Sequence, residues 1–288
     1  MNYSSAYKTG TDRLSAAGIP EAALDSRLLL EFITGCGLTD VLAHPERELT
    51  DDEAAAYERA LSRRAEHVPL SYITHTCGFM GIVFRVSADV LIPRQDSECL
   101  VEEAMRYTYD GSDILDLCTG SGCLLLSLMH YKNGCRGVGV DISEEALCLA
   151  RENQRLLDED GGLNGGSAKF ICGDMFDAVP SGMRFDVIIS NPPYIRTGDI
   201  EGLMPEVALH EPRIALDGGP DGLMFYRKIA ARSGEYLAPG GYIFLEIGYD
   251  QAGDVRMLLR DAGFSDIEVI KDYSGNDRVI KAEARRRA

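Results

Sequence analysis

Residues Phe185 to Tyr194 read FDVIISNPPY, an apolar, β-branched run that stops at an Asn-Pro-Pro-Tyr corner. The run is too short for a helix and is typical of a strand buried on both faces, as in parallel sheets. Each proline fixes its own φ, lacks an N–H donor and restricts the residue before it. The stretch therefore predicts a buried strand with a rigid polar end, which is where α/β sheets bind ligands.

The corner also carries groups that suit a flat –NH2 group. The side-chain oxygen of Asn191 and the backbone carbonyl of Pro192 can each accept a hydrogen bond. Pro193 stiffens the turn, and Tyr194 adds an aromatic face. Taken alone, such residues more often only end a strand and cap a turn, so their function depends on the rest of the chain.

After residue 110, strand-like and helix-like segments alternate. This alternation predicts a doubly wound, mostly parallel α/β sheet of seven strands with right-handed crossovers. A short Ser-Gly-Asn-Asp turn separates the last two strands, which should form an antiparallel hairpin at the sheet edge. The expected strands are 114–118, 137–142, 169–172, 186–190, 242–247, 267–271 and 278–282, and the expected helices are 123–131, 144–157, 222–237 and 250–262.

The amino-terminal part has helical periodicity and no catalytic motif. Pro20 stands where a first helical residue is favoured, and Thr50 opens a capping-box sequence. An apolar stripe predicts packing in a small helical bundle, and consists of Leu24, Leu28, Leu29, Phe32 and Ile33. Residues 70–90 change to β-branched and aromatic residues with glycine, which predicts a hairpin.

Composition limits the function classes. The 288-residue chain has a formal net charge of −17, which argues against a duplex nucleic-acid substrate and favours a basic protein partner. No apolar run approaches the roughly 20 residues of a membrane span, and the amino terminus lacks a signal-peptide core. We therefore expect a cytoplasmic protein that does not act at a membrane.

The eight cysteines include no C-x-x-C pair and no Cys/His cluster at zinc-ligand spacing. Reduced thiols are the more common state of such cysteines. The sequence predicts neither a disulfide nor a metal site.

Residues 113–122, DILDLCTGSG, form a strand that runs into a glycine turn at a helix start. Such a turn allows close backbone approach and offers free N–H groups, although a plain strand-to-helix turn fits equally well. Asp141 follows Gly120 by 21 positions (141 − 120), near the spacing of about 20 at which an acidic residue bonds ribose hydroxyls. Its rival role, capping the next helix, can be filled by Ser143. Because Leu125 replaces the third glycine of a pyrophosphate motif, an adenosine cofactor without phosphates is favoured.

The third strand closes with Gly-Asp-Met-Phe. Asp174 can bond an adenine amino group while Met175 covers the ring. A solvated turn explains these two residues as well.

With these strand ends, the chain resembles the class I S-adenosylmethionine-dependent methyltransferases, a Rossmann-like fold, in which NPPY is the signature for amino-nitrogen methylation. More narrowly, it resembles the release factor glutamine methyltransferases, the PrmC/HemK family. The matching stretches cover most of residues 69–280: PLSYITHTCGF, ADVLIPRQDSECLVEEA, ILDLCTGSG, VDIS, GDMF, FDVIISNPPYI, HEPRIALDGGPDGLMFYRKI, GGYIFLEIG and DYSGNDRVI. Two residues depart from the family: Cys118 replaces a glycine, and Met175 an aromatic residue.

The resemblance implies S-adenosyl-L-methionine as cofactor, S-adenosyl-L-homocysteine as product, and no metal. Residues 1–68 would be a bundle that binds the substrate protein, 69–92 a hairpin linker, and 93–288 the methyltransferase domain. Asn191, Pro192 and Tyr194 would be catalytic, and with Pro193 they would hold the substrate glutamine. The implied cofactor residues are Asp116, Cys118, Thr119, Gly120, Ser121, Gly122, Asp141, Asp174, Met175 and Asn191.

The implied reaction is methylation of the N(5) amide of a glutamine in the Gly-Gly-Gln loop of class I peptide chain release factors. Two acceptors on the substrate –NH2 would orient the nitrogen and stabilise the positive charge that develops on it. We expect a monomeric enzyme. The alternatives are N(6)-adenine methylation of DNA or RNA by base flipping, and a non-catalytic adaptor.

Overall fold

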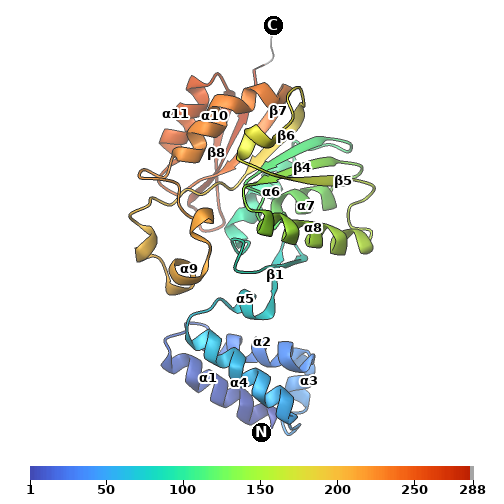
Figure 1. The fold of residues 1–288 in the computed structure, drawn as a ribbon, viewed down its shortest axis with the longest axis vertical. Coiled ribbons are helices and arrows are strands. Elements are labelled where there is room, and N and C mark those ends of the chain that lie inside the picture. The colour runs from blue at the N-terminus through green and yellow to red at the C-terminus, as the bar shows by residue number, and fades with distance from the viewer. Residues whose placement is uncertain (286–288) are drawn as a thin grey trace. The chain divides into compact units, whose positions relative to one another are not determined.

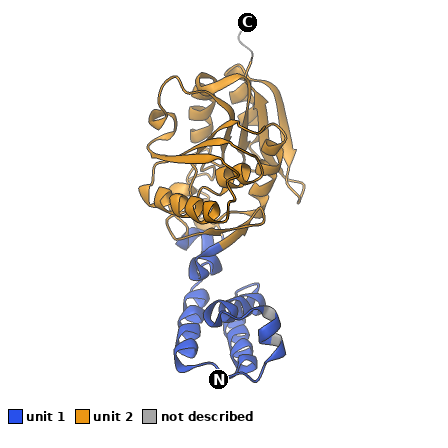
Figure 2. Cartoon of the chain, turned by 90° about the vertical axis from the view of Figure 1, so that its right-hand side faces the viewer, with its two compact units in different colours: residues 1–76, 204–210 blue, residues 77–203, 211–288 orange. Residues whose placement is uncertain are grey.

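The computed structural model describes residues 1–285, which divide into two compact units (Figure 2). The first unit holds residues 1–76 together with 204–210, and the second holds residues 77–203 and the remainder from 211. A short piece of the long segment after the NPPY corner therefore belongs to the helical unit, which the sequence did not indicate.

The first unit is entirely helical. Its helices are α1 (Tyr3–Ala16), α2 (Ala22–Thr34), α3 (Leu38–Ala43), α4 (Asp51–Ala65), α5 (Leu70–Thr74) and α9 (Pro205–His210). The capping box at Thr50 is confirmed, because its side chain accepts from the Glu53 N–H and the Glu53 carboxylate accepts from the Thr50 N–H. Pro20 was expected to be the first residue of α2, but the helix begins at Ala22.

The apolar stripe of α2 was only partly right. Leu29 is buried as expected, and its neighbour Leu30 is buried with it, whereas Leu24 and Phe32 are exposed. The buried residues of α2 are Ala22, Asp25, Ser26, Leu29 and Leu30, and the hydroxyl of Tyr57 in α4 lies 2.8 Å from that of Ser26.

A buried ion pair attaches α9 to the bundle. Arg64, which is 6% exposed, donates to Asp25 at 2.7 Å and to Glu206 of α9 at 3.1 Å. Removing one member of such a pair leaves an uncompensated buried charge. This contact explains why residues 204–210 pack with the helical unit.

The second unit contains the expected seven-stranded sheet, in the order β5-β4-β3-β6-β7-β9-β8 (Figure 1). Its strands are β3 (Asp113–Leu117), β4 (Arg136–Asp141), β5 (Ser167–Cys172), β6 (Phe185–Ser190), β7 (Leu237–Glu246), β8 (Ser265–Lys271) and β9 (Asp277–Glu283). The first five strands are parallel, and β9 pairs antiparallel with both β7 and β8. The doubly wound sheet with an antiparallel edge hairpin is confirmed.

Helices cover both faces of the sheet, as a doubly wound fold requires (Figure 1). One face packs on α6 (Glu98–Met105), α7 (Cys123–His130) and α8 (Glu144–Glu159), and the other on α10 (Met224–Tyr236) and α11 (Ala252–Asp261). Alternate residues of the central strands separate accordingly: Ile189 of β6 packs on the α7 side and Ile188 on the α10 side. This double burial explains why Val187, Ile188 and Ile189 are three consecutive apolar residues, all fully buried.

The predicted hairpin is shorter than expected. Residues 70–74 form helix α5, and the hairpin consists of β1 (Thr76–Phe79) and β2 (Ile82–Arg85). The Tyr-Ile-Thr segment has strand propensity, but Tyr72 and Ile73 bury their side chains from a helical turn that begins after Pro69. Within residues 1–285, no helix combines the length and the apolar character needed to cross a bilayer.

Candidate active site

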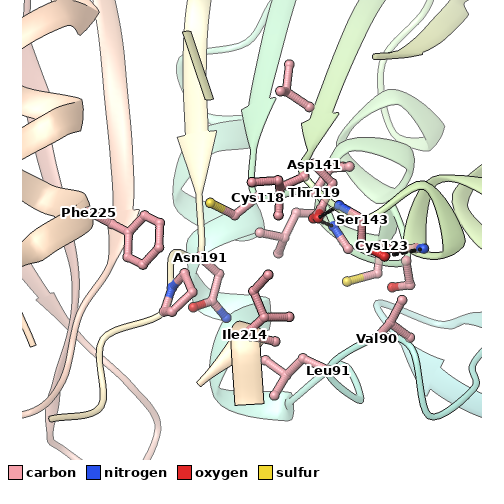
Figure 3. Close-up of a pocket in the computed structure, with 18 of the residues that line it drawn as sticks. Val90, Leu91, Cys118, Thr119, Cys123, Asp141, Ser143, Asn191, Ile214 and Phe225 are labelled. Carbon is pink, nitrogen blue, oxygen red and sulfur yellow. Dashed lines mark hydrogen bonds between the residues drawn. The ribbon is translucent and has the colours of Figure 1, made fainter. Parts of the chain in front are cut away.

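A cavity of about 210 Å³ lies at the carboxyl ends of β3, β4 and β6 (Figure 3). Parallel strands end together at one edge of the sheet, so the loops after them converge there. The lining contains Asp89, Val90, Leu91, Pro93, Arg94, Ser97, Cys118, Thr119, Gly120, Ser121, Cys123, Leu124, Val140, Asp141, Ile142, Ser143, Ala146, Gly173, Asp174, Met175, Asn191, Pro193, Ile214, Ala215, Phe225 and Lys228.

The loop after β3 has an unusual backbone. Cys118, Gly120 and Gly122 have φ values of 58°, 53° and 78°, all in the left-handed region. A Cβ on Gly120 would meet no heavy atom within 4 Å, so the space beside it is open. The loop leads directly into the first turn of α7, whose N–H groups favour polar or negative ligand groups.

Asp141, at the end of β4, is built into this loop. Its Oδ2 accepts from the backbone N–H of Gly120 at 2.9 Å, and its Oδ1 from that of Ser143 at 3.0 Å. Burial raises the pKa of the carboxyl, and these backbone donors partly oppose that shift. The rival capping role belongs to Ser143, whose hydroxyl accepts from the Ala146 N–H at the start of α8. Asp141 is not needed as that cap, and it lines the cavity.

Asp116 lies beneath the loop and does not line the cavity. It is fully buried, and its Oδ2 accepts from the Thr119 hydroxyl at 2.6 Å. Its Oδ1 has no partner within residues 1–285. Burial raises the pKa of Asp116 to about 7. Its hydrogen bond to Thr119 supports the loop.

Cys118 and Met175, the two residues that depart from the family pattern, both line the cavity and both have positive φ. Cys118 takes φ 58°, a conformation that explains why glycine is usual there. Burial raises the pKa of its thiol well above the ordinary value. The thiol is therefore neutral and unreactive, and contributes only surface to the cavity lining. Met175 takes φ 49° and is 6% exposed, which places a soft apolar side chain at the cavity edge.

Asp174 has an ion-pair partner that the sequence did not reveal. The Nζ of Lys228, from α10, lies 2.8 Å from its Oδ2 and 3.2 Å from its Oδ1. Both residues line the cavity. The carboxylate is thus held in place by a helix more than fifty residues away in the chain.

Asn191 lies on the cavity wall with its amide fixed. Its Nδ2 donates to the hydroxyl of Ser97 at 3.3 Å, and no hydrogen bond within residues 1–285 engages its Oδ1. The backbone carbonyl of Pro192 likewise accepts no hydrogen bond within that range. The two oxygens proposed for an –NH2 group therefore remain available as acceptors.

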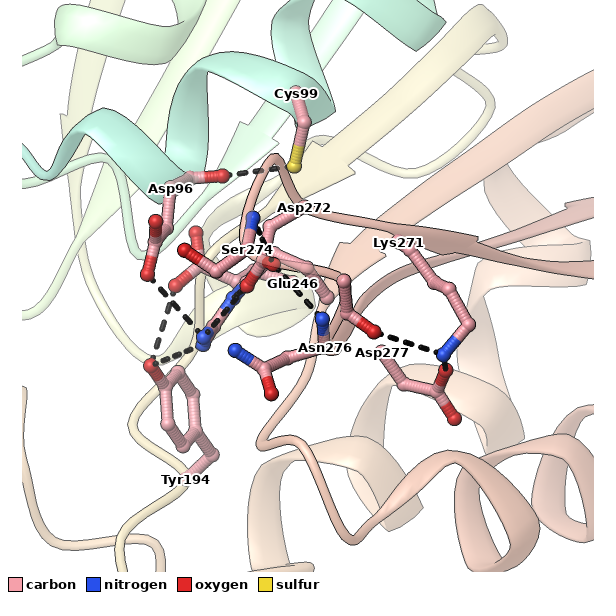
Figure 4. Close-up of polar contacts among 11 residues, drawn as sticks. Asp96, Cys99, Tyr194, Glu246, Lys271, Asp272, Ser274, Asn276 and Asp277 are labelled. Atoms are coloured by element: carbon pink, nitrogen blue, oxygen red, sulfur yellow. Dashed lines mark hydrogen bonds and ion pairs between the residues drawn. The ribbon is translucent and has the colours of Figure 1, made fainter.

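Tyr194 is anchored behind the cavity by a buried polar network (Figure 4). Its hydroxyl donates to Glu246 Oε1 at 3.2 Å, and Arg278 donates to the same hydroxyl at 3.5 Å. Arg278 also pairs with Asp96 at 3.3 Å and with Asp272 at 3.1 Å. The network joins the NPPY corner to the LIPRQDSE, FLEIG and DYSGNDRVI stretches.

Two glycines of the LDGGPDG stretch allow the chain to pack on the corner. A Cβ on Gly218 would lie 2.7 Å from Cα of Tyr194, and a Cβ on Gly222 would lie 2.4 Å from the carbonyl oxygen of Tyr194. Both contacts are with backbone, which cannot move aside as a flexible side chain can. The segment therefore requires glycine in order to hold the NPPY corner from outside.

An ion pair links two further family stretches at the cavity. Arg94 of LIPRQDSE donates to Glu211 of HEPRIAL at 2.5 Å, and the Glu211 side chain is nearly inaccessible. Burial raises the pKa of Glu211, and the charge of Arg94 partly opposes this shift. The pair holds together two segments that both contribute residues to the cavity lining.

The structure brings most of the sequence-predicted residues to the cavity lining: Cys118, Thr119, Gly120, Ser121, Asp141, Asp174, Met175, Asn191 and Pro193. It places the others, which are Asp116, Gly122, Pro192 and Tyr194, outside that lining. Sequence reasoning missed Ser97, Arg94, Lys228 and Phe225 as site residues, although the family stretches containing them were noted. The described residues hold no cluster of three or more metal-ligating side chains.

Two family models match the chain. The PrmC N-terminal domain matches residues 5–74, and a methyltransferase domain matches residues 109–243. A crystal structure of a methyltransferase from Pyrococcus furiosus superposes with a TM-score of 0.52 at 19% identity, covering 70% of this chain and 88% of that one. Fold and site together define a class I methyltransferase domain of the Rossmann-like type.

Curated relatives narrow the family. The release factor glutamine methyltransferase of Caulobacter vibrioides is 42% identical, over 96% of this chain and 94% of its own length. That of Agrobacterium fabrum is 41% identical, over 93% and 92% of the two chains. The chain belongs to the release factor glutamine methyltransferase family.

Proposed function

We propose that the chain transfers a methyl group from S-adenosyl-L-methionine to the N(5) side-chain amide of a glutamine in the Gly-Gly-Gln loop of class I peptide chain release factors. The family supports the reaction class. The observation that carries the proposal for this chain is a pair of acceptors, Asn191 Oδ1 and the Pro192 carbonyl oxygen, that no hydrogen bond among residues 1–285 engages, at a rigid corner beside the cavity.

The cavity suits an adenosine-containing cofactor. The left-handed loop around Gly120 leaves open space beside the backbone, and the Asp141 carboxyl stands at the end of β4, where ribose hydroxyls are bonded in this fold. Met175 and Val140 supply apolar surface for a flat ring, and Asp174 lies next to Met175 for an amino group. When bound, the cofactor supplies an activated sulfonium methyl group.

The protein's own task is to orient a poor nucleophile. The lone pair of an amide nitrogen is delocalised into its carbonyl, so the nitrogen must be presented in the attacking geometry. Acceptance of both N–H bonds by Asn191 and Pro192 fixes the amide plane and stabilises positive charge as it develops on nitrogen. Tyr194, clamped by Glu246, keeps this corner rigid. The proton leaves after the transfer, so a strong general base is unnecessary.

The division of labour between the two units stays a prediction. We infer that residues 1–68, in the helical unit, bind the release factor, while residues 93–288 carry out the transfer. The net charge of −17 suits a basic protein partner better than a nucleic acid.

The test is incubation of the purified chain with the methyl donor and a class I release factor, a DNA duplex, or buffer alone. Mass spectrometry should find one added methyl group on the loop glutamine of the release factor. Transfer to DNA alone would favour the adenine methyltransferase alternative. Cofactor binding without transfer to any acceptor would favour a non-catalytic adaptor.

A further inference from the structure

The Ser97 hydroxyl occupies an unusual position at the end of the turn η1 (Gln95–Ser97). It stands at the N-cap position of α6, yet its side chain makes no capping hydrogen bond to that helix. Serine at this position normally satisfies a helix N–H. The Ser97 side chain instead faces the cavity, where it is 3% exposed and accepts from Asn191 Nδ2 at 3.3 Å.

A second buried group contacts the same hydroxyl. The carboxyl of Glu246, which is 1% exposed at the end of β7, lies near Ser97, whose hydroxyl opposes the rise in the pKa of that carboxyl. Tyr194 occupies Oε1 of that carboxyl, whereas Oε2 has no close partner within residues 1–285. The only proton that Ser97 can offer thus has a buried acceptor beside it.

This arrangement distinguishes the two ends of the Asn191 amide. With its proton directed to Glu246, Ser97 Oγ presents only lone pairs to Asn191. In the observed orientation, Asn191 Nδ2 donates to one of those lone pairs. If the amide were flipped, Oδ1 would face the Ser97 lone pairs instead, and it could be satisfied only if the Ser97 proton turned away from the carboxyl. Leaving a buried carboxyl oxygen without its donor is costly, so the flipped state is disfavoured.

The charges around the network keep Glu246 an acceptor. Burial raises the pKa of Glu246, but the nearby Ser97 hydroxyl, the positive charge of Arg278 and the hydrogen bond from Tyr194 oppose that shift. Arg278 is held near it by Asp272 and Asp96. The carboxyl therefore has one fixed donor, the Tyr194 hydroxyl, and a positive charge nearby (Figure 4).

We propose that Ser97 is a positioning residue that, backed by Glu246, fixes the Asn191 amide with Nδ2 inward and Oδ1 toward the substrate nitrogen. Its role rests on the proposed function, because an inward Oδ1 would leave the substrate –NH2 facing another donor. Ser97 touches neither the substrate nitrogen nor the methyl group in this role. It acts only through Asn191.

The experiment compares Ser97→Ala, Ser97→Thr and a control, Ser127→Ala, in methyl transfer to the release factor. Ser127 is a fully buried serine of α7 whose hydroxyl has no partner within residues 1–285. Ser97→Ala should lower kcat by about 10- to 100-fold, the range expected when a reacting group is misplaced, with unchanged binding of the methyl donor. Ser97→Thr keeps the hydroxyl and should restore kcat, and the control should match the wild type.

A double-mutant cycle separates positioning from general packing. If Ser97 acts through Asn191, Ser97→Ala should cause little further loss in single-turnover rate when Asn191 is already alanine. Three outcomes would each overturn the proposal. The two losses could be fully additive, Ser97→Thr could be as impaired as Ser97→Ala, or Ser97→Ala could leave kcat unchanged. If Ser97→Ala does not fold, Ser97→Cys, with similar volume and a weaker hydrogen bond, replaces it in the cycle.

A measurement without substrate keeps this proposal distinct from the proposed function. The side-chain amide resonances of Asn191, assigned by their loss in Asn191→Ala, should shift in Ser97→Ala and stay near the wild-type position in Ser97→Thr. Unchanged resonances in Ser97→Ala would overturn the positioning role. A wild-type chain that leaves the release factor unmethylated would refute the proposed function, while these resonances would still decide the Ser97 contact.

Discussion

The hydroxyl of Tyr194 donates to Oε1 of Glu246 across 3.2 Å, although the two residues lie 52 positions apart in the chain. They meet because β6 and β7 are parallel neighbours, with Ser190 in register with Leu245 just before the two strand ends. Glu246 is 1% exposed, so the donor is part of what makes burial of this carboxyl tolerable. The NPPY corner is therefore anchored from inside the sheet as well as stiffened by its prolines.

Replacing Tyr194 with phenylalanine should lower the free energy of unfolding by about 1–3 kcal/mol, because it removes a donor from a buried carboxyl. The aromatic ring stays, so binding of the methyl donor should be retained. Chemical denaturation measures the change, with Tyr249→Phe as control, because Tyr249 is 71% exposed. Equal stabilities of the two variants would contradict the anchoring role.

Asn191→Ala should retain the fold and bind the methyl donor, yet reduce methyl transfer about 10²- to 10³-fold, as the loss of one charge-stabilising contact does elsewhere. Circular dichroism and calorimetric titration with the donor check the first two points, and single-turnover assays check the third. Full activity in this variant would refute the acceptor role of Asn191.

Gly218→Ala should displace the NPPY corner, because the new methyl group would lie 2.7 Å from Cα of Tyr194 and 2.8 Å from the Pro193 carbonyl oxygen. We expect a loss of about 1–3 kcal/mol in stability, as for other overpacked sites, and a lower kcat. Gly198→Ala is the matched control in the same long segment, since a Cβ there meets nothing within 4 Å. Wild-type kinetics for Gly218→Ala would show that the corner tolerates displacement.

Asp116→Asn should flatten the dependence of stability on pH. The folded-state pKa of Asp116 is raised to about 7, whereas an unfolded aspartate has a pKa of about 3.9. Between these values the folded state binds more protons, so wild-type stability should fall as pH rises, by up to about 4 kcal/mol for this group. Denaturation at pH 5 and pH 8 should therefore show a larger loss for the wild type than for the variant. Parallel curves would argue that Asp116 ionises normally.

The NPPY residues and the glycine loop were predictable because their chemistry is local. A strand of β-branched residues, two prolines and a turn at positive φ each specify backbone conformation within a few residues. Residues 70–74 were mispredicted as strand because tertiary burial of Tyr72 and Ile73 outweighed their strand propensity. The exposed Leu24 and Phe32 show the same limit, since periodicity gives a stripe but not its partner.

By itself, the sequence determined the succession of strands and helices along the chain. It also determined the rigid acceptor corner, the loop at Gly120 and the acidic residue Asp141 at a strand end. These features depend on neighbours in sequence. Only the tertiary structure decided that Ser97 contacts Asn191, that Lys228 pairs with Asp174, and that Glu246 lies under Tyr194. Those contacts join residues 52 to 94 positions apart. They arise where strand ends and loops converge at one edge of the sheet, a convergence that no local pattern encodes.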